Sequence, residues 1–187
     1  MVDLKQYKYL FLDRDGVINI ERPNDYAKTI SEFVFIEGAS QAIARLSQIF
    51  EHIFIITNQR GVGRGVMSRT DLEEIHQYML DGIKREGGNI SGIYVCTDTC
   101  HSSINRKPNI GMAFKTQNDF PDVDFSESIM VGNSRSDIEF GKKLGMYTVL
   151  VGNKYSKNDK IYKIVDANYE NLYKFAYTTN LRQNDNK

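Results

Sequence analysis

Two aspartates two positions apart follow a short apolar run near the start of the chain. Residues 7–12 are aromatic and aliphatic and end at Asp13-Arg14-Asp15-Gly16, as a buried strand ending at a turn does. Residues i and i+2 of extended backbone face the same side, so Asp13 and Asp15 can act on one substrate. One carboxylate can attack as a nucleophile while the other shuttles a proton. An acidic turn after a strand is also common, so the function depends on what else reaches this place.

Three later segments are suited to holding a phosphoryl group and a hard cation. Residues 57–65, Thr-Asn-Gln-Arg-Gly-Val-Gly-Arg-Gly, offer a hydroxyl, amides and glycine-rich backbone to phosphate oxygens, although a flexible loop is the alternative interpretation. Residues 106–108, Arg-Lys-Pro, add two fixed positive charges. Asn133, after Gly132, and Asp137 provide oxygen ligands suited to a hard cation.

The elements that must position these segments alternate between strands and helices. Ser68 with Asp71 three residues on resembles a capping box, and the helix that it opens ends at Gly87-Gly88. Alternation of this kind predicts an α/β, three-layer Rossmann-like fold with a mostly parallel central sheet, whose ligands bind at the carboxyl ends of the strands. Apolar spacing predicts strands at residues 7–12, 53–56, 93–96, 129–131 and 147–151, and further helices at 38–50, 112–119, 136–144.

The pattern weakens after residue 151. We expect a polar loop at 153–159, an edge strand at 162–165, a final helix at 168–177 and a frayed tail at 178–187. One domain over residues 1–177 follows, because the insert at 20–35 is too short for a separate cap domain. Polar residues of that insert are expected to line an open pocket: Glu21, Arg22, Asn24, Asp25 and Tyr26.

Composition and charge bound the class of partner. The chain has 187 residues, 41% of them apolar, which suffices for one core. Basic and acidic residues number 24 each, so there is no overall attraction to nucleic acid or to an anionic membrane. Two cysteines and the lack of a long hydrophobic run predict a reducing compartment without signal peptide or membrane span. We expect a cytoplasmic monomer acting on a small phosphorylated metabolite, with no nucleic-acid or membrane partner.

Taken in order, the four segments resemble the four motifs of the haloacid dehalogenase (HAD) superfamily of phosphohydrolases. The resemblance covers residues 7–151, and each motif follows a predicted strand as in that superfamily. Residues 12–19 (Leu-Asp-Arg-Asp-Gly-Val-Ile-Asn), 57–59, and 106–108 with Gly111-Met112 are more specifically similar to D-glycero-D-manno-heptose 1,7-bisphosphate 7-phosphatases. Histidinol-phosphate phosphatases share this pattern closely, and the phosphatase half of polynucleotide kinase/phosphatases shares it more loosely.

The resemblance implies a role for each matching residue. Asp13 is the nucleophile that forms an aspartyl phosphate, and Asp15 is the general acid for the leaving oxygen and then the base for water. Thr57 and Lys107 hold the transferring group and neutralise its charge. The remainder of the substrate, a second phosphate or sugar hydroxyls, is expected against Asn58, Gln59, Arg60, Gly61, Arg64 and Arg106.

The fourth motif departs from the family, which has aspartate where this chain has Asn133. The resemblance implies Mg²⁺ bound by Asp13, the backbone carbonyl of Asp15, Asn133 and Asp137. An amide oxygen can still coordinate a hard cation. The loss of one negative charge therefore predicts reduced magnesium affinity rather than an inactive enzyme.

Heptose phosphatases of this type often carry a zinc loop ahead of the third motif, and here that loop is shortened. Cys96 matches its first ligand, but Asp98 stands where histidine would be, and Ser103 and Asn105 replace the final cysteine pair. Without a Cys-x-x-Cys spacing a zinc site is not expected. The ligands left for a weak site are Cys96, Asp98, Cys100 and His101.

Four functions compete. A phosphatase acting on a heptose bisphosphate in the route to cell-surface glycans is favoured, and one acting on histidinol phosphate is the nearest rival. A nucleic-acid 3′-phosphatase would need a basic groove. A non-catalytic phosphate-binding protein is suggested by Asn133, but it has no need of the Asp13 and Asp15 pair. His52 and His76 are expected at the surface or its boundary, outside the chemistry.

Overall fold

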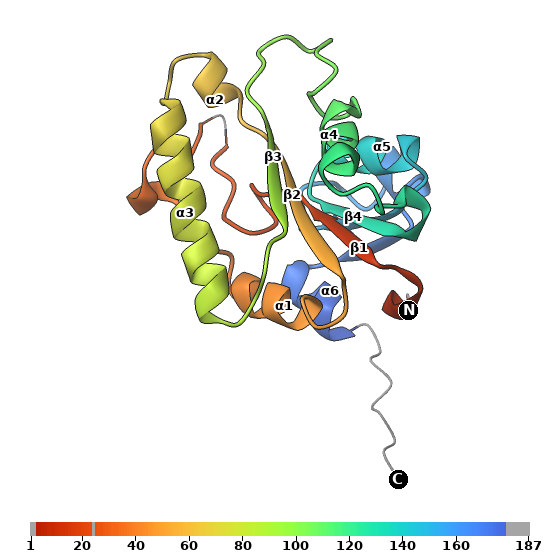
Figure 1. The fold of residues 1–187 in the computed structure, drawn as a ribbon. Helices are drawn as coiled ribbons and strands as arrows, with labels where there is room; N and C mark the ends of the chain where they lie inside the picture. Colours follow the sequence, from red (N-terminus) through yellow and green to blue (C-terminus); the bar gives the residue numbers. More distant parts are fainter. Residues whose placement is uncertain (1–2, 24, 179–187) are drawn as a thin grey trace.

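The chain folds around one six-stranded sheet, described here from a computed structural model over residues 3–23 and 25–178. All neighbouring strands pair in parallel, in the order β3-β2-β1-β4-β5-β6 (Figure 1). Asn24 and the expected tail beyond residue 178 lie outside the described residues. The strands are β1 (Tyr9–Leu12), β2 (His52–Asn58), β3 (Gly92–Cys96), β4 (Ser128–Gly132), β5 (Tyr147–Val151) and β6 (Ala167–Tyr169).

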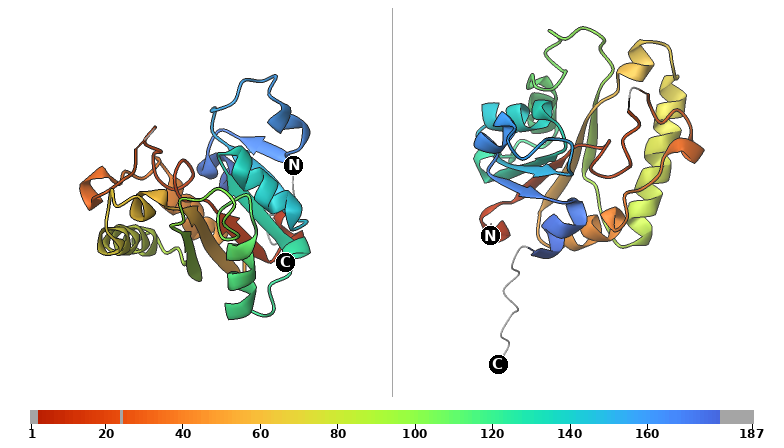
Figure 2. Two further views of the ribbon diagram at one scale, coloured as in Figure 1. Left: turned by 90° about the horizontal axis from the view of Figure 1, so that it is seen from above. Right: turned by 180° about the vertical axis from the view of Figure 1, so that it is seen from behind.

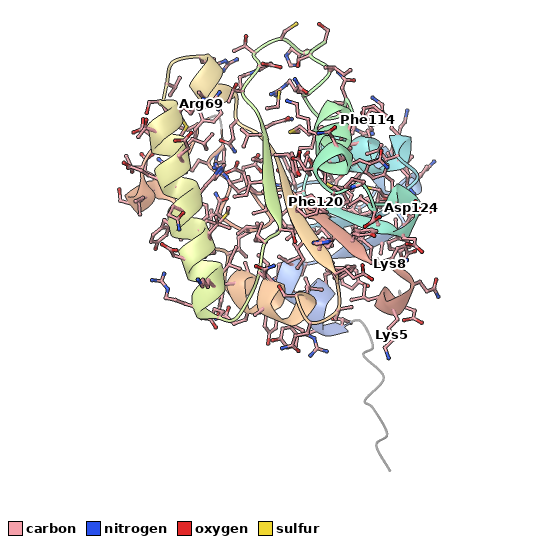
Figure 3. The ribbon with its side chains drawn as sticks, viewed as in Figure 1. Lys5, Lys8, Arg69, Phe114, Phe120 and Asp124 are labelled. Carbon is pink, nitrogen blue, oxygen red and sulfur yellow. The ribbon has the colours of Figure 1, made fainter. Side chains whose placement is uncertain are left out.

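Helices cover both faces of the sheet, which gives the expected three layers (Figures 1 and 2). Side chains alternate along β1, so Leu10 and Leu12 enter the core with one helix layer and Tyr9 and Phe11 the core with the other. Phe120, at the end of α4, packs against Phe54 of β2 with ring centroids 5.0 Å apart (Figure 3). The first layer has α1 (Ala39–Leu46), α3 (Arg69–Arg85) and α6 (Leu172–Thr178), and the second has α4 (Gly111–Asp119) and α5 (Arg135–Lys143).

Strand order places the motif segments together. The chain moves outward from β1 through β2 to β3 and then returns to β4 on the other side of β1, so the order switches beside β1. Ligands of such sheets bind at this switch, outside the carboxyl ends of the strands. That edge is the upper one in Figure 1, where the short helix α2 (Arg60–Gly63) follows β2.

The segment between β1 and α1 adds no separate cap domain among the described residues. Its regular structure there is one 3₁₀ turn, η2 (Ile30–Glu32), which contacts α3. The capping box at the start of α3 is confirmed, because the Ser68 hydroxyl accepts from the Asp71 N–H and Asp71 accepts from the Ser68 N–H. In the described residues, no helix is both long and apolar enough to cross a membrane.

The end of the chain differs from the sequence-based expectation. The edge strand expected at 162–165 is wrong, because that region lies at the end of a 3₁₀ helix, η4 (Lys160–Lys163). The sixth strand is β6, which takes the first residues of the helix expected at 168–177, so that α6 begins only at Leu172. Short segments without alternation carry too weak a pattern to separate a strand from a single helical turn.

Close packing of α5 on the sheet depends on Gly141. A Cβ atom there would lie 2.7 Å from the Thr148 Cγ2 and 2.9 Å from the Met130 Cβ. Alanine in a helix interior is ordinarily favoured over glycine by about 1 kcal/mol, but overpacking costs about 1–3 kcal/mol. We expect Gly141→Ala to lower the free energy of unfolding in urea, with Glu139→Ala on the same helix as control. A gain in stability would contradict this packing.

Candidate active site

One buried ammonium group connects the motif segments at the carboxyl edge of the sheet. The Lys107 Nζ lies 2.8 Å from the Asp13 Oδ1, 2.7 Å from the Asp137 Oδ1 and 2.7 Å from the Ile56 carbonyl oxygen. The two carboxylate contacts are ion pairs, and the carbonyl contact is a hydrogen bond. Burial opposes the charged form, but the two carboxylates outweigh it and raise the pKa of Lys107. The side chain is therefore a fixed cation that holds the ends of β1 and β2 to α5.

Asp13 keeps one oxygen available for chemistry. Both of its recorded partners, the Lys107 ammonium and the Arg14 N–H at 2.8 Å, contact Oδ1. Within the described residues no hydrogen bond reaches Oδ2. Burial and then the nearby Asp137 charge raise the pKa of Asp13 to about 7, against the opposing effect of Lys107. Two carboxylates share one cation here, so the site has an excess of negative charge.

Asp15 is held by three donors, two from its own segment after β1 and one from the segment after β2. Its carboxylate accepts from the Arg14 guanidinium at 3.0 Å, the Asn19 amide at 2.9 Å and the Gln59 amide at 2.7 Å. Burial acts to raise the pKa, but the Arg14 charge and the hydrogen bonds from all three donors outweigh it and lower the pKa of Asp15. The resting carboxylate is thus ionised and fixed in direction.

Arg14 and His76 belong to the site although sequence reasoning gave them no role. Arg14 is 0% exposed, and its Nη1 lies 3.1 Å from the His76 Nε2. Because arginine only donates, this nitrogen of His76 accepts. Burial and then the Arg14 charge lower the pKa of His76 to about 4. The expectation of a surface or boundary His76 is wrong, and a signal existed: it falls at helical spacing among the apolar residues of α3.

The end of β2 and the residues that follow it mostly support other site residues. Thr57 and Gln59 are buried, and the Gln59 Nε2 donates to the Thr57 Oγ1 at 2.8 Å as well as to Asp15. Asn58 exchanges two hydrogen bonds with the backbone of Lys107, at 3.1 Å and 3.3 Å. Gly61 packs against the Tyr26 ring, whose Cγ lies 2.9 Å from where a Cβ of residue 61 would be. Gln59, predicted to face substrate, instead links two other site residues.

Asn133 meets a carboxylate that its motif did not predict. Its Nδ2 donates to the Glu21 Oε2 at 2.9 Å, and Glu21 also pairs with the Lys154 ammonium at 3.0 Å. The amide lies directly against Gly16, where a Cβ would be 1.8 Å from Nδ2. The positive φ of 81° at Gly16 also favours glycine. Within the described residues no hydrogen bond reaches the Asn133 Oδ1.

Asp137, predicted as a metal ligand, accepts hydrogen bonds through Oδ2, whereas its Oδ1 is in an ion pair but has no hydrogen bond among the described residues. Its Oδ2 accepts from the Ser134 N–H at 2.9 Å and from the Ser134 hydroxyl at 2.6 Å, which caps α5. Its Oδ1 pairs with Lys107. Asp137 therefore joins the start of α5 to the buried ammonium.

A cavity of about 430 Å³ opens beside Asp15. The acids on its wall already have cations, because Asp25 pairs with Lys28 at 2.7 Å and Glu21 with Lys154. The remaining lining residues are Arg22, Tyr26, Ala27, Asn58 and Arg64.

Arg64 of the cavity wall, together with Arg60 and Arg106, has no acidic partner within ion-pair distance among the described residues. Burial lowers the pKa of Arg106, and the charges of Arg60 and Arg64 lower it further. Arg60 donates to the Thr99 carbonyl, but its Nε and the Arg106 Nη1 are buried without partners. Unpaired guanidinium groups of this kind are suited to an anion.

The residues of the candidate zinc loop bond to other groups. Asp98 accepts from the Ser103 hydroxyl, Cys100 contacts Ser102, and His101 contacts the Arg60 guanidinium at 2.8 Å. Cys96 is buried at the end of β3. In the described part of the chain, no three His, Cys, Asp or Glu side chains gather as metal ligands. Amide and backbone carbonyl oxygens, which this set does not include, can also be metal ligands.

Comparison with known proteins gives a consistent group of relatives. A family model described as HAD-hydrolase-like matches residues 104–171. A D-glycero-alpha-D-manno-heptose-1,7-bisphosphate 7-phosphatase of Burkholderia mallei is 37% identical over 150 residues, covering 76% of this chain and 78% of the relative. A D-glycero-beta-D-manno-heptose-1,7-bisphosphate 7-phosphatase of Neisseria meningitidis is 36% identical over 145 residues, covering 77% and 76%.

A solved structure matches the fold over nearly its whole length. It is a D,D-heptose 1,7-bisphosphate phosphatase from B. bronchiseptica complexed with magnesium and phosphate, 30% identical to this chain. The TM-score is 0.83, and the match covers 91% of this chain and 97% of that one.

The raised pKa of Asp13 predicts how stability depends on pH in the metal-free protein. The unfolded chain releases this proton near pH 3.8 and the folded chain near pH 7, so the folded state binds more protons in between. Wild-type stability therefore falls as the pH rises through this window, and Asp13→Asn removes the loss. We expect the stability of the variant relative to wild type to rise by on the order of 2 kcal/mol between about pH 4 and about pH 8, measured by urea unfolding in EDTA. A difference between the two proteins that does not change with pH would contradict the assigned shift.

Proposed function

This chain belongs to the HAD phosphatase family that includes the heptose 1,7-bisphosphate 7-phosphatases, and we propose that it removes the 7-phosphate from a D-glycero-D-manno-heptose 1,7-bisphosphate. The chain is a phosphatase of the HAD class by this relationship. The choice of substrate is supported by one observation above the others: Arg60, Arg64 and Arg106 have no acidic partner among the described residues, whereas the acids Glu21 and Asp25 of the cavity wall are paired.

The residues present fit a magnesium ion. The Asp13 Oδ2 and the Asn133 Oδ1 are oxygen donors without hydrogen bonds among the described residues, and the Asp15 backbone carbonyl belongs to the same turn. Hard divalent cations take such oxygen ligands. A cation would also offset the excess negative charge of the two carboxylates that share Lys107. A bound magnesium ion would supply positive charge to the phosphoryl oxygens. Asp137 acts through Lys107 in this arrangement.

The reaction uses Asp13 as a nucleophile in two steps. A carboxylate oxygen of Asp13 bonds to phosphorus as the bond from phosphorus to the sugar oxygen breaks, and Asp15 gives that oxygen a proton. Asp15 then takes a proton from water as the water oxygen bonds to phosphorus and the aspartyl phosphate bond breaks. The lowered pKa of Asp15 leaves its carboxylate ionised before the substrate binds. The negative charge of the bound phosphate raises the pKa of this carboxyl group, so Asp15 takes up its proton when the substrate binds.

Lys107 and Thr57 support both steps. Lys107 holds Asp13 in place and offsets negative charge that develops on the phosphoryl group. The Thr57 Oγ1 accepts from Gln59, which leaves its own proton to donate to a phosphoryl oxygen. Gln59 also bonds to Asp15, so the acid and the threonine are held at a fixed separation.

The second phosphate of the substrate would meet Arg60, Arg64 and Arg106. A histidinol phosphate would instead bring a cation to this region, where the acids Glu21 and Asp25 are already neutralised by Lys154 and Lys28. Charge therefore favours a bisphosphate over histidinol phosphate. We further propose that the enzyme works as a cytoplasmic monomer without nucleic-acid or membrane partners, since its two cysteines are free and its basic and acidic residues balance.

Phosphate release from a panel of substrates tests the proposal. The panel holds both anomers of heptose 1,7-bisphosphate, histidinol phosphate and a 3′-phosphorylated oligonucleotide, with magnesium present and Asp13→Asn as the control. We expect turnover of one or both heptose bisphosphates, lost in the control because its amide cannot form the aspartyl phosphate. Faster turnover of histidinol phosphate or of the oligonucleotide would overturn the assigned substrate, and activity retained in the control would overturn the assigned nucleophile.

Arg64 gives a separate test of the second-phosphate site, because it lines the cavity without a carboxylate partner. Loss of a hydrogen bond to a charged group costs about 1.5–3 kcal/mol, or roughly 10–100-fold. Arg64→Ala should raise KM for the bisphosphate by that factor and leave kcat/KM for heptose 7-phosphate unchanged. The control is Arg69→Ala, an exposed arginine at the start of α3 (Figure 3). Equal effects on both substrates would contradict the assignment.

A further inference from the structure

Asn133 poses a specific chemical problem for a magnesium site. A carboxylate offers an oxygen in either orientation, whereas a carboxamide offers an oxygen in one and an NH₂ group in the other. An NH₂ group turned toward a cation repels it. A functional amide ligand therefore needs something that fixes which end faces the metal.

Glu21 supplies that constraint. Its carboxylate can only accept, so the group of Asn133 that lies 2.9 Å away must be the NH₂ end. The amide packs closely on Gly16, since its Nδ2 lies 1.8 Å from where a Cβ of residue 16 would be. Asn133 is 7% exposed, so little water competes for the amide. The oxygen is then the end left for the metal.

Lys154 keeps Glu21 available for this task. Its ammonium lies 3.0 Å from both carboxylate oxygens of Glu21, and this pair is partly exposed. The positive charge of Lys154 offsets the repulsion between Glu21 and the phosphorylated substrate. The three residues come from separate segments: the loop after β1, the end of β4 and the loop after β5.

We propose that Glu21 is a positioning residue that orients the Asn133 amide with its oxygen toward magnesium, which lets an asparagine replace the aspartate found in this motif elsewhere in the family. The role rests on the proposed function only in needing the magnesium site. It acts through a hydrogen bond and does not require Glu21 to touch the metal.

Magnesium binding measured without substrate tests this role. Isothermal titration of the full chain with MgCl₂ compares wild type with Glu21→Ala and Glu21→Gln. The alanine variant loses the acceptor, and outer-shell losses of this kind weaken metal binding roughly 10–100-fold. The glutamine variant keeps an acceptor oxygen without the charge, so we expect its Kd within about threefold of wild type.

Asn133→Asp gives the second half of the test. A carboxylate needs no orientation, so adding Glu21→Ala to this variant should leave the magnesium Kd unchanged or tighten it, because a like charge is removed. Asp25→Asn is the matched control, since Asp25 lines the same cavity but pairs with Lys28 and does not contact Asn133. It should bind magnesium as wild type does.

Each outcome decides the role of Glu21. If Glu21→Ala leaves the Kd unchanged, Glu21 does not orient the amide. If Glu21→Gln loses as much as Glu21→Ala, the residue acts through its charge and the proposal is wrong. An equal loss from Glu21→Ala in the Asn133→Asp background would also overturn it. Because no sugar phosphate is present, failure of the substrate assignment would leave these measurements unaffected.

Discussion

The geometry of this site depends on one buried lysine and the three oxygens around it. Lys107 lies in a loop, yet its ammonium is held by an aspartate directly after β1, a carbonyl of β2 and an aspartate of α5. A charge buried in this way is stable only while its partners remain, because an unpaired buried ion costs several kcal/mol. The balance is deliberately incomplete, since two carboxylates share one cation. On the proposed function, a bound metal ion would offset this excess of negative charge, which is the usual compromise between stability and activity.

Much of the architecture and the chemical centre could be predicted from the sequence. Strands and helices alternate with clear apolar periods, and the carboxyl ends of parallel strands necessarily share one edge, so Asp13, Thr57 and Asn133 had to meet. Asp13 and Asp15 were predictable as a pair because extended backbone repeats every two residues. These inferences depend on local patterns and on one rule of sheet geometry.

What sequence reasoning missed depends on contacts between distant segments. Glu21 meets Asn133 across 112 positions, and Arg14 meets His76 across 62. No local period encodes such pairs. Gln59 was taken for a substrate contact because polar residues after a strand favour ligands, but the turn at residue 59 directs its amide inward to Asp15 and Thr57. The short strand β6 was missed for another reason: three residues carry too little pattern to distinguish from a turn.

The segment between β1 and α1 contacts both the cavity and Asn133, which restricts how its sequence can change. Its Tyr26 covers Gly61 at the cavity, while its Glu21 holds the Asn133 amide. If Glu21 positions Asn133 as proposed, mutations that reshape this loop for a new substrate also disturb the metal site. A relative with aspartate at this position needs no residue to orient it, so the sequence of its loop can change without affecting the metal ligand. In this chain the same loop would serve both the substrate cavity and the orientation of Asn133. Selection on either function then restrains changes that affect the other.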